Sequence, residues 1–164
     1  MAETADLLRA KVLVVSDGVI AGTREDRSGP ALAALLVDAG WDVAGWDTVA
    51  DGTESVALAL RRMTEGFAGL VVTTGGTGFG PRDLTPEGTR LVLDRDAPGL
   101  AEAARLANPV KGRLSRGIAG IVGRCIVLNT PGSTSGAVES LEAVLDVLPH
   151  ALALLADRPT THPS

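Results

Sequence analysis

The chain has 164 residues, of which 45% are hydrophobic and 21% charged, and its formal net charge is −5. This length and composition predict one soluble globular domain, and its single cysteine, Cys125, leaves no intrachain disulfide. The acidic balance, the lack of a basic run and the scarcity of aromatic residues (two Trp, two Phe, no Tyr) argue against a nucleic-acid-binding protein.

Targeting and membrane signals are missing from the sequence. The opening stretch MAETADLLRAK lacks the basic and apolar regions of a secretory signal, and no apolar run approaches the roughly 18–20 residues that span a membrane. We therefore expect a cytoplasmic protein with no membrane partner. We expect residues 1–10 to be an N-terminal extension, 11–156 the domain, and 157–164 a flexible tail.

The first half of the chain alternates between apolar strands and helical patterns. Residues 12–15 (VLVV) predict a strand buried on both faces. Pro30 is expected at the first position of a helix that Gly40 closes. Residues 42–49 predict a weaker strand, and a helical pattern begins at Asp51.

The second half continues this alternation. Thr85 and Pro86 predict a helix start, with Thr85 as the N-cap. Residues 115–123 are glycine-rich and ambiguous. The remaining expected elements are strands at 70–73 and 125–129 and helices at 98–107 and about 137–156.

Strands that alternate with helices predict an α/β fold: a single three-layer α/β/α domain with a mostly parallel sheet. In such a sheet, ligands bind beyond the carboxyl ends of the strands. The unusual loops all follow strands, so we expect four of them to meet at one edge: SDG (16–18), Asp51, TGGTGFGPRD (74–83) and NTPGS (129–133).

The loop at 74–83 resembles a phosphate loop but matches neither the Walker A pattern nor the dinucleotide-binding pattern. Its glycines, Gly75, Gly76, Gly78 and Gly80, allow close backbone approach, so that successive N–H groups can surround an anion. The alternative is a tight strand-to-helix turn. Arg82 is a candidate clamp for a phosphate or carboxylate, and Asp83 a candidate Mg²⁺ ligand. Their alternative is an ordinary solvated ion pair.

Two further positions carry competing interpretations. Asp51 and Glu54 have the spacing of a capping box, with Asp51 as the N-cap, and a carboxylate there can also face a metal. Ser133 and the small-residue loop around it are suited to a second phosphate or to a plain helix N-cap. Cys125 lies in an apolar run and is expected to be a buried, inert thiol. The residues alone thus predict a phosphate-rich ligand at the sheet edge, and an Mg²⁺ ion on two aspartates is an option.

The segments TTGGTGFGPRDLTPEGT, EDRSGPAL and LNTPGS together resemble the MogA/MoaB type of molybdenum cofactor biosynthesis protein, which also occurs as the G domain of gephyrin. PGLAEAAR, SRGIAG and LPHAL match as well, so the resemblance covers nearly the whole chain. It implies that the protein binds molybdopterin and transfers AMP from Mg-ATP to its terminal phosphate, releasing pyrophosphate. It further implies a homotrimer, or a hexamer, and a MoeA-like partner that inserts molybdate.

The resemblance also implies roles for individual residues. It makes Asp51 and Asp83 the catalytic residues and the holders of Mg²⁺. The residues that match substrate-binding positions are Ser16, Asp17, Ser28, Thr74, Gly75, Gly76, Thr77, Gly78, Arg82, Pro131, Gly132 and Ser133. One departure is Ala50, where family members often have a proline before the first aspartate. The alternative function is a non-catalytic paralogue that binds molybdopterin or acts as a protein-interaction module.

Overall fold

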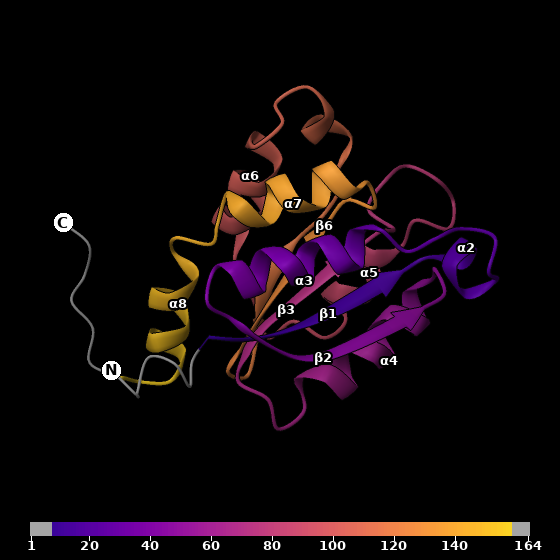
Figure 1. Cartoon of the computed structure of the whole chain (residues 1–164). Helices are drawn as coiled ribbons and strands as arrows, with labels where there is room; N and C mark the ends of the chain where they lie inside the picture. Colours follow the sequence, from indigo (N-terminus) through magenta and orange to yellow (C-terminus); the bar gives the residue numbers. More distant parts are fainter. Residues whose placement is uncertain (1–7, 159–164) are drawn as a thin grey trace.

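The computed structural model describes residues 8–158 of the chain (Figure 1). The expected extension at 1–10 and tail at 157–164 therefore lie largely outside the described residues. The elements are, in order, β1 (Arg9–Val15), α2 (Asp17–Ile20), α3 (Ser28–Asp38), β2 (Asp42–Val49), α4 (Thr53–Thr64), β3 (Gly69–Thr74), α5 (Thr85–Arg90), β4 (Arg95–Asp96), α6 (Pro98–Leu106), the 3-10 helix η1 (Lys111–Leu114), β5 (Ala119–Val122), β6 (Cys125–Thr130), α7 (Thr134–Glu142) and α8 (Leu148–Leu155).

The strands form one six-stranded sheet in the order β2-β1-β3-β6-β5-β4. The neighbouring pairs from β2 to β6 are parallel, and β5 and β4 add to the edge in antiparallel pairs. The mostly parallel sheet is thus confirmed. The ambiguous segment 115–123 contains β5, which turns directly back into β6 and needs no crossover helix.

Helices cover both faces of the sheet, which confirms the three layers (Figure 1). On β1, Val12 and Val14 pack into one cluster with apolar side chains of α3, α6, α7 and α8. The alternate residues, Leu13 and Val15, pack into a second cluster with α4. This alternation explains why the strand has a continuous apolar sequence, since both of its faces are buried.

Two helix predictions were wrong in their bounds. The single helix expected at 137–156 is two helices, α7 and α8, and Pro149 occupies the first turn of α8, where a missing N–H costs no hydrogen bond. Helix α3 begins at Ser28, two residues before Pro30, and Asp26 Oδ1 accepts a 3.0 Å hydrogen bond from the Gly29 N–H in its first turn.

The topology places a switch point between β1 and β3. The chain leaves β1 for β2 on one side and returns to β3 on the other, so loops diverge at the carboxyl ends of β1 and β3. Such a point is where open parallel sheets bind ligands. Within residues 8–158, no helix has the length and apolar character needed to cross a membrane.

Candidate active site

A cavity of about 920 Å³ opens at the switch point. Residues of all four expected loops line it, which confirms that these loops meet at one edge of the sheet. The predicted site residues in its lining are Ser16, Ser28, Asp51, Thr74, Gly75, Gly76, Thr77, Gly78, Asp83, Pro131, Gly132 and Ser133. Asp17 and Arg82 are not among the lining residues.

The glycine loop begins with a close approach between two strand ends. Gly75 has φ +102°, and a Cβ atom there would lie 2.1 Å from the Val15 carbonyl oxygen. Gly76 has φ +68°, and its Cβ would lie 2.2 Å from the Thr85 hydroxyl and 3.1 Å from Asp51 Oδ1. Only glycine fits both positions, and the second places the loop backbone directly against a predicted catalytic carboxylate.

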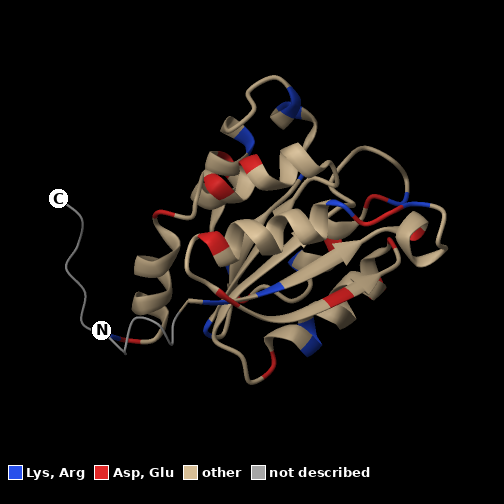
Figure 2. Ribbon diagram, viewed as in Figure 1, with Lys and Arg blue, Asp and Glu red and all other residues tan. Residues whose placement is uncertain are grey.

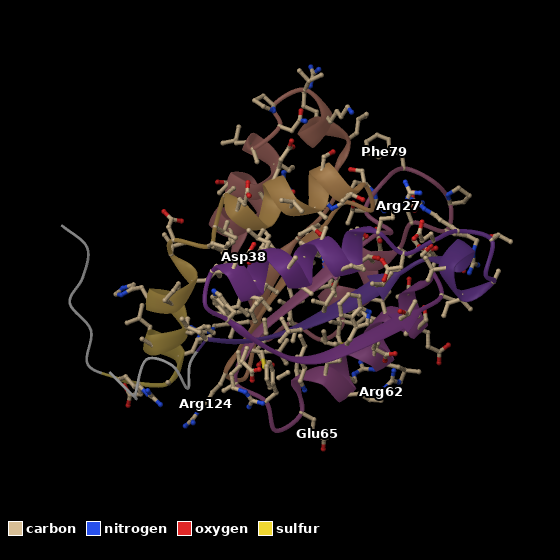
Figure 3. All side chains as sticks on the ribbon, viewed as in Figure 1. Arg27, Asp38, Arg62, Glu65, Phe79 and Arg124 are labelled. Carbon is tan, nitrogen blue, oxygen red and sulfur yellow. The ribbon has the colours of Figure 1, made fainter. Side chains whose placement is uncertain are left out.

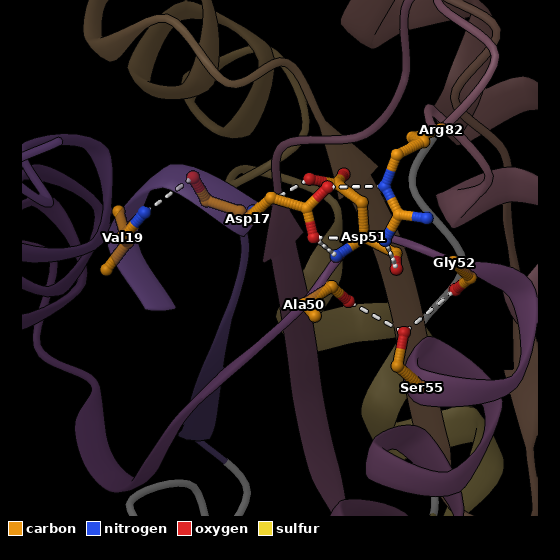
Figure 4. A network of polar contacts seen from close by, with 8 residues as sticks. Asp17, Val19, Ala50, Asp51, Gly52, Ser55 and Arg82 are labelled. Atoms are coloured by element: carbon orange, nitrogen blue, oxygen red, sulfur yellow. Dashed lines mark hydrogen bonds and ion pairs between the residues drawn. The ribbon is translucent and has the colours of Figure 1, made fainter. Parts of the chain in front are cut away.

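Asp51 does not cap helix α4, so the capping interpretation is wrong. The N-cap position is Gly52, and Asp51 is held by Asp17 in a reciprocal pair. The Asp17 N–H donates to Asp51 Oδ2 (2.9 Å), and the Asp51 N–H donates to Asp17 Oδ1 (3.1 Å) (Figure 4). Burial raises the pKa of Asp51, and the nearby carboxylates of Asp17 and Asp83 raise it further.

Arg82 binds Asp17 and not its sequence neighbour Asp83. Its guanidinium donates hydrogen bonds to both carboxylate oxygens of Asp17, and its Nη2 also donates to the Asp51 carbonyl at 2.9 Å (Figure 4). The hydrogen bond from Arg82 lowers the pKa of Asp17. Arg82 therefore joins the Asp51 loop to the Asp83 loop, and its fork is occupied by protein oxygens.

Asp83 lies beside the later glycines of the loop, Gly78 and Gly80. Its Oδ2 accepts a 2.9 Å hydrogen bond from the Gly80 N–H and lies 2.9 Å from where a Cβ of Gly78 would be. Within residues 8–158, no hydrogen bond reaches Asp51 Oδ1 or Asp83 Oδ1. Each carboxylate thus keeps one oxygen available to a ligand.

The opposite wall of the cavity is built from hydroxyl groups and the start of α7. The Thr74 hydroxyl lies 2.8 Å from the Pro131 carbonyl oxygen and 2.9 Å from the Ser28 hydroxyl. Because a hydroxyl has one proton, Thr74 donates to Pro131 and accepts from Ser28. The Ser133 hydroxyl accepts from the Gly136 N–H at 3.2 Å, so Ser133 is the N-cap of α7 and also lines the cavity.

Thr85 has a different role from the expected one. The N-cap of α5 is Leu84, and the Thr85 hydroxyl donates to the Gly75 carbonyl at 2.9 Å. Below the loop, the buried Asn129 side chain joins three segments: its Nδ2 donates to the hydroxyls of Thr73 and Thr89, and its Oδ1 accepts from the Ile118 N–H. These contacts fix the cavity floor to the sheet.

Sequence reasoning missed two groups at this site. Cationic residues to which the sequence analysis gave no role also line the cavity: Arg24, Arg27, Arg105 and Lys111. Arg116 does not line the cavity but hydrogen-bonds the carbonyl oxygens of Gly78 and Asp83. The only sequence signal for Arg116 was its place in SRGIAG, to which no role was attached.

Over the described residues, charges of both signs are interspersed along the chain and do not gather in one basic stretch (Figure 2).

The donor set at Asp51 and Asp83 fits a hard divalent cation. Carboxylate oxygens are the ligands that Mg²⁺ prefers, and Mg²⁺ is usually held by one or two carboxylates plus substrate phosphates. Among residues 8–158, no group of three His, Cys, Asp or Glu side chains could hold a metal ion. A cation at this place would therefore complete its coordination with water molecules and with oxygens of a bound ligand.

A family model described as a probable molybdopterin binding domain matches residues 11–150. The chain belongs to this molybdenum cofactor biosynthesis family. The resemblance to MogA/MoaB proteins is thereby confirmed, and a solved structure agrees with it. The crystal structure of the molybdopterin biosynthesis enzyme MoaB from Thermus thermophilus has 46% sequence identity and a TM-score of 0.85, covering 94% of this chain and 99% of that one.

Curated relatives of the family are similar at lower identity. The molybdenum cofactor synthesis protein cinnamon of Drosophila melanogaster is 36% identical over 152 residues, which are 89% of this chain and 25% of that protein. A molybdopterin adenylyltransferase of Helicobacter pylori is 35% identical over 150 residues, covering 88% of this chain and 85% of that protein. The chain spans between 22% and 48% of the first four curated relatives, so it corresponds to one part of those longer proteins.

Proposed function

We propose that the protein is a molybdopterin adenylyltransferase: it binds molybdopterin and Mg-ATP and transfers AMP to the terminal phosphate of the pterin. The observation that carries the proposal is the pair Asp51 and Asp83, each held by a backbone N–H and each with one oxygen available beside the glycine loop. The name of the Helicobacter pylori relative supports the same activity, since the chain covers most of that protein.

The reaction joins two anions and needs positioning more than covalent chemistry. An oxygen of the pterin phosphate attacks the α-phosphorus of ATP and forms a new P–O bond, while the bond from that phosphorus to the bridging oxygen breaks and pyrophosphate leaves. The backbone of residues 76–78 would hold phosphate oxygens at the cavity floor, since the Gly75 N–H already donates to the Thr130 carbonyl. The loop at 131–133 would bind the second anion near the start of α7, whose N-terminal dipole end is positive.

Asp51 and Asp83 would hold Mg²⁺ together with the nucleotide phosphates. When bound, the ion would neutralise charge on the phosphates and act as a Lewis acid. The Asp17 N–H holds the Asp51 carboxylate in place, and the Gly80 N–H holds the Asp83 carboxylate. Asp17 and Arg82, which were expected to bind substrate, act in this proposal through Asp51 and not on the ligand.

The test is to incubate the protein with molybdopterin and Mg-ATP and to measure pyrophosphate and adenylylated pterin. Asp83→Asn should abolish AMP transfer while pterin binding remains. The matched control is Asp38→Asn, because Asp38 is an exposed residue of α3 outside the cavity lining (Figure 3). Wild-type turnover by Asp83→Asn would remove the proposed role of Asp83. Pterin binding by the wild type without any AMP transfer would select the non-catalytic alternative.

We also propose a homotrimer that passes its product to a MoeA-like partner. A mainly apolar groove between α6 and the segment that joins α7 to α8, lined by Leu100, Ala103, Val144 and Val147, supports a self-association surface. Light scattering should give three times the mass of one chain; the mass of a single chain would contradict this part of the proposal.

A further inference from the structure

The loop that carries Asp83 has little support from its own hydrogen bonds. Between Gly78 and Asp83, the bonds within the loop are those that join Gly80 and Asp83: the Asp83 N–H donates to the Gly80 carbonyl (3.0 Å), and the Gly80 N–H donates to Asp83 Oδ2 (2.9 Å). Phe79, at the outer side of this loop, is 71% exposed (Figure 3). A loop with so few internal contacts needs outside support to hold a carboxylate in a fixed place.

Arg82 supplies part of that support through Asp17 and the Asp51 carbonyl, and Arg116 adds to it from a segment 33 residues away. Its backbone N–H donates to the Thr77 carbonyl (2.8 Å), and its Nε donates to the Gly78 carbonyl (2.8 Å). Its Nη2 donates to the Asp83 carbonyl, and its Nη1 pairs with Glu87 in α5. One side chain thus joins the start of the loop, the end of the loop and the helix that follows it.

The segment around Arg116 is itself fixed on its other side. The Gly117 carbonyl accepts a 2.7 Å hydrogen bond from Arg105 of α6, and the Ile118 N–H donates to the buried Asn129 side chain at 3.1 Å. Arg116 therefore extends from an anchored backbone toward the Asp83 loop. The planar guanidinium fork can serve several oxygens at once, which a lysine ammonium cannot do with the same geometry.

We propose that Arg116 is a positioning residue that holds the loop from Gly78 to Asp83 and thereby sets the place of the Asp83 carboxylate. This proposal rests on the proposed function only for its effect on catalysis. Arg116 does not line the cavity, and its charge is directed at Glu87, whose pKa is lowered first by the hydrogen bond from Arg116. Its effect on the ligand is therefore indirect.

The test compares Arg116→Gln and Arg116→Lys with Arg113→Gln. Arg113 is a matched control because it is exposed and, within residues 8–158, its side chain donates only to the Val110 carbonyl next to its own 3-10 helix (3.1 Å). Hydrogen–deuterium exchange is followed on peptides from the 77–84 loop and from α7. In Arg116→Gln, the loop should exchange at least roughly tenfold faster with α7 unchanged, as expected when several hydrogen bonds are lost locally. Arg116→Lys should lie between this variant and the wild type.

Kinetics supply the second readout. Arg116→Gln should lower kcat for AMP transfer roughly 10- to 100-fold, since a displacement of about 1 Å at a catalytic group has effects of this order. The KM for molybdopterin should stay within about threefold, because the loop at 131–133 is untouched. Arg113→Gln should match the wild type in both.

The outcomes separate this inference from the proposed function. Unchanged loop exchange in Arg116→Gln overturns the inference, as does faster exchange throughout the protein, and wild-type kcat with a loosened loop overturns the link to catalysis. If the wild type itself transfers no AMP, the proposed function fails, and exchange still decides the role of Arg116. If Arg116→Gln does not fold, Arg116→Lys is judged by the same exchange criterion.

Discussion

The contact between the ends of β1 and β3 gives the sharpest prediction, at Gly75. Replacing Gly75 with alanine places a Cβ atom 2.1 Å from the Val15 carbonyl oxygen, at a backbone φ of +102° that alanine rarely adopts. Positive φ alone costs an alanine about 1–2 kcal/mol, and overpacking of a tight contact adds about 1–3 kcal/mol. Because alanine restricts the unfolded chain more than glycine does, the substitution also stabilises the fold by about 0.4–1 kcal/mol. We therefore expect Gly75→Ala to lower the free energy of unfolding by about 3 kcal/mol.

Gly66→Ala isolates the contribution of the contact. Gly66 also has positive φ (+63°), but no atom lies within 4 Å of the position that a Cβ atom would take there, so this variant should lose only about 1 kcal/mol. For a chain of this length each kcal/mol changes Tm by roughly 2–4 °C, which predicts a Tm drop of roughly 6–12 °C for Gly75→Ala against roughly 2–4 °C for Gly66→Ala. Circular dichroism melts measure both. Equal Tm drops would show that the strand ends do not approach as described.

Three further predictions concern charge and burial. The pKa of Asp51 is raised in the fold, so its ionisation opposes folding above its ordinary value of 3.8. The Tm difference between Asp51→Asn and the wild type should therefore shift in favour of the variant as the pH rises from 4 to 7, and the variant should lose AMP transfer. A shift of this Tm difference in favour of the wild type would contradict the raised pKa of Asp51. Arg82→Gln should lower AMP transfer roughly 10- to 100-fold by freeing Asp17 and the Asp51 loop, measured as kcat against an Arg62→Gln control on the exposed Arg62–Asp47 pair; equal kcat values would refute it. Burial raises the pKa of Cys125 to about 11, so iodoacetamide at pH 8 should label it at least roughly 100-fold more slowly in the native protein than in urea, and fast native labelling would contradict its burial.

The fold was predictable because its apolar pattern is strong. Strands with continuous apolar runs, such as 12–15 and 70–73, are buried on both faces. Such a run can be recognised from the local sequence alone, without knowing which elements pack against it. Helix ends were less predictable. Asp51 and Thr85 both have the residue types of an N-cap, yet the Asp51 side chain binds the Asp17 N–H of another loop and the Thr85 hydroxyl binds the Gly75 carbonyl at the start of its own loop. Local spacing cannot show such tertiary competition for a side chain.

The site was predictable where it depends on backbone and topology. The glycine loop, Asp51, Asp83 and the loop at 131–133 follow strands of one parallel sheet, so their meeting follows from strand order alone. The pairing of Arg82 with Asp17 spans 65 residues and depends on side-chain direction, which the sequence does not encode locally. Arg116 was missed for the same reason, since its partners Gly78, Asp83 and Glu87 lie in a distant part of the sequence.

The arrangement separates the holding of the carboxylates from the binding of the ligand. Asp51 is held by Asp17 and Arg82 next to Gly76, whereas Asp83 is held by Gly80 and Arg116 next to Gly78. Neither arginine lines the cavity, so both positive charges face protein oxygens and leave the carboxylates negative toward the ligand. Two like-charged carboxylates and a phosphorylated substrate repel one another, and a divalent cation between them removes that repulsion. Under the proposed function, this electrostatic balance would let a phosphate loop without a lysine hold a nucleotide.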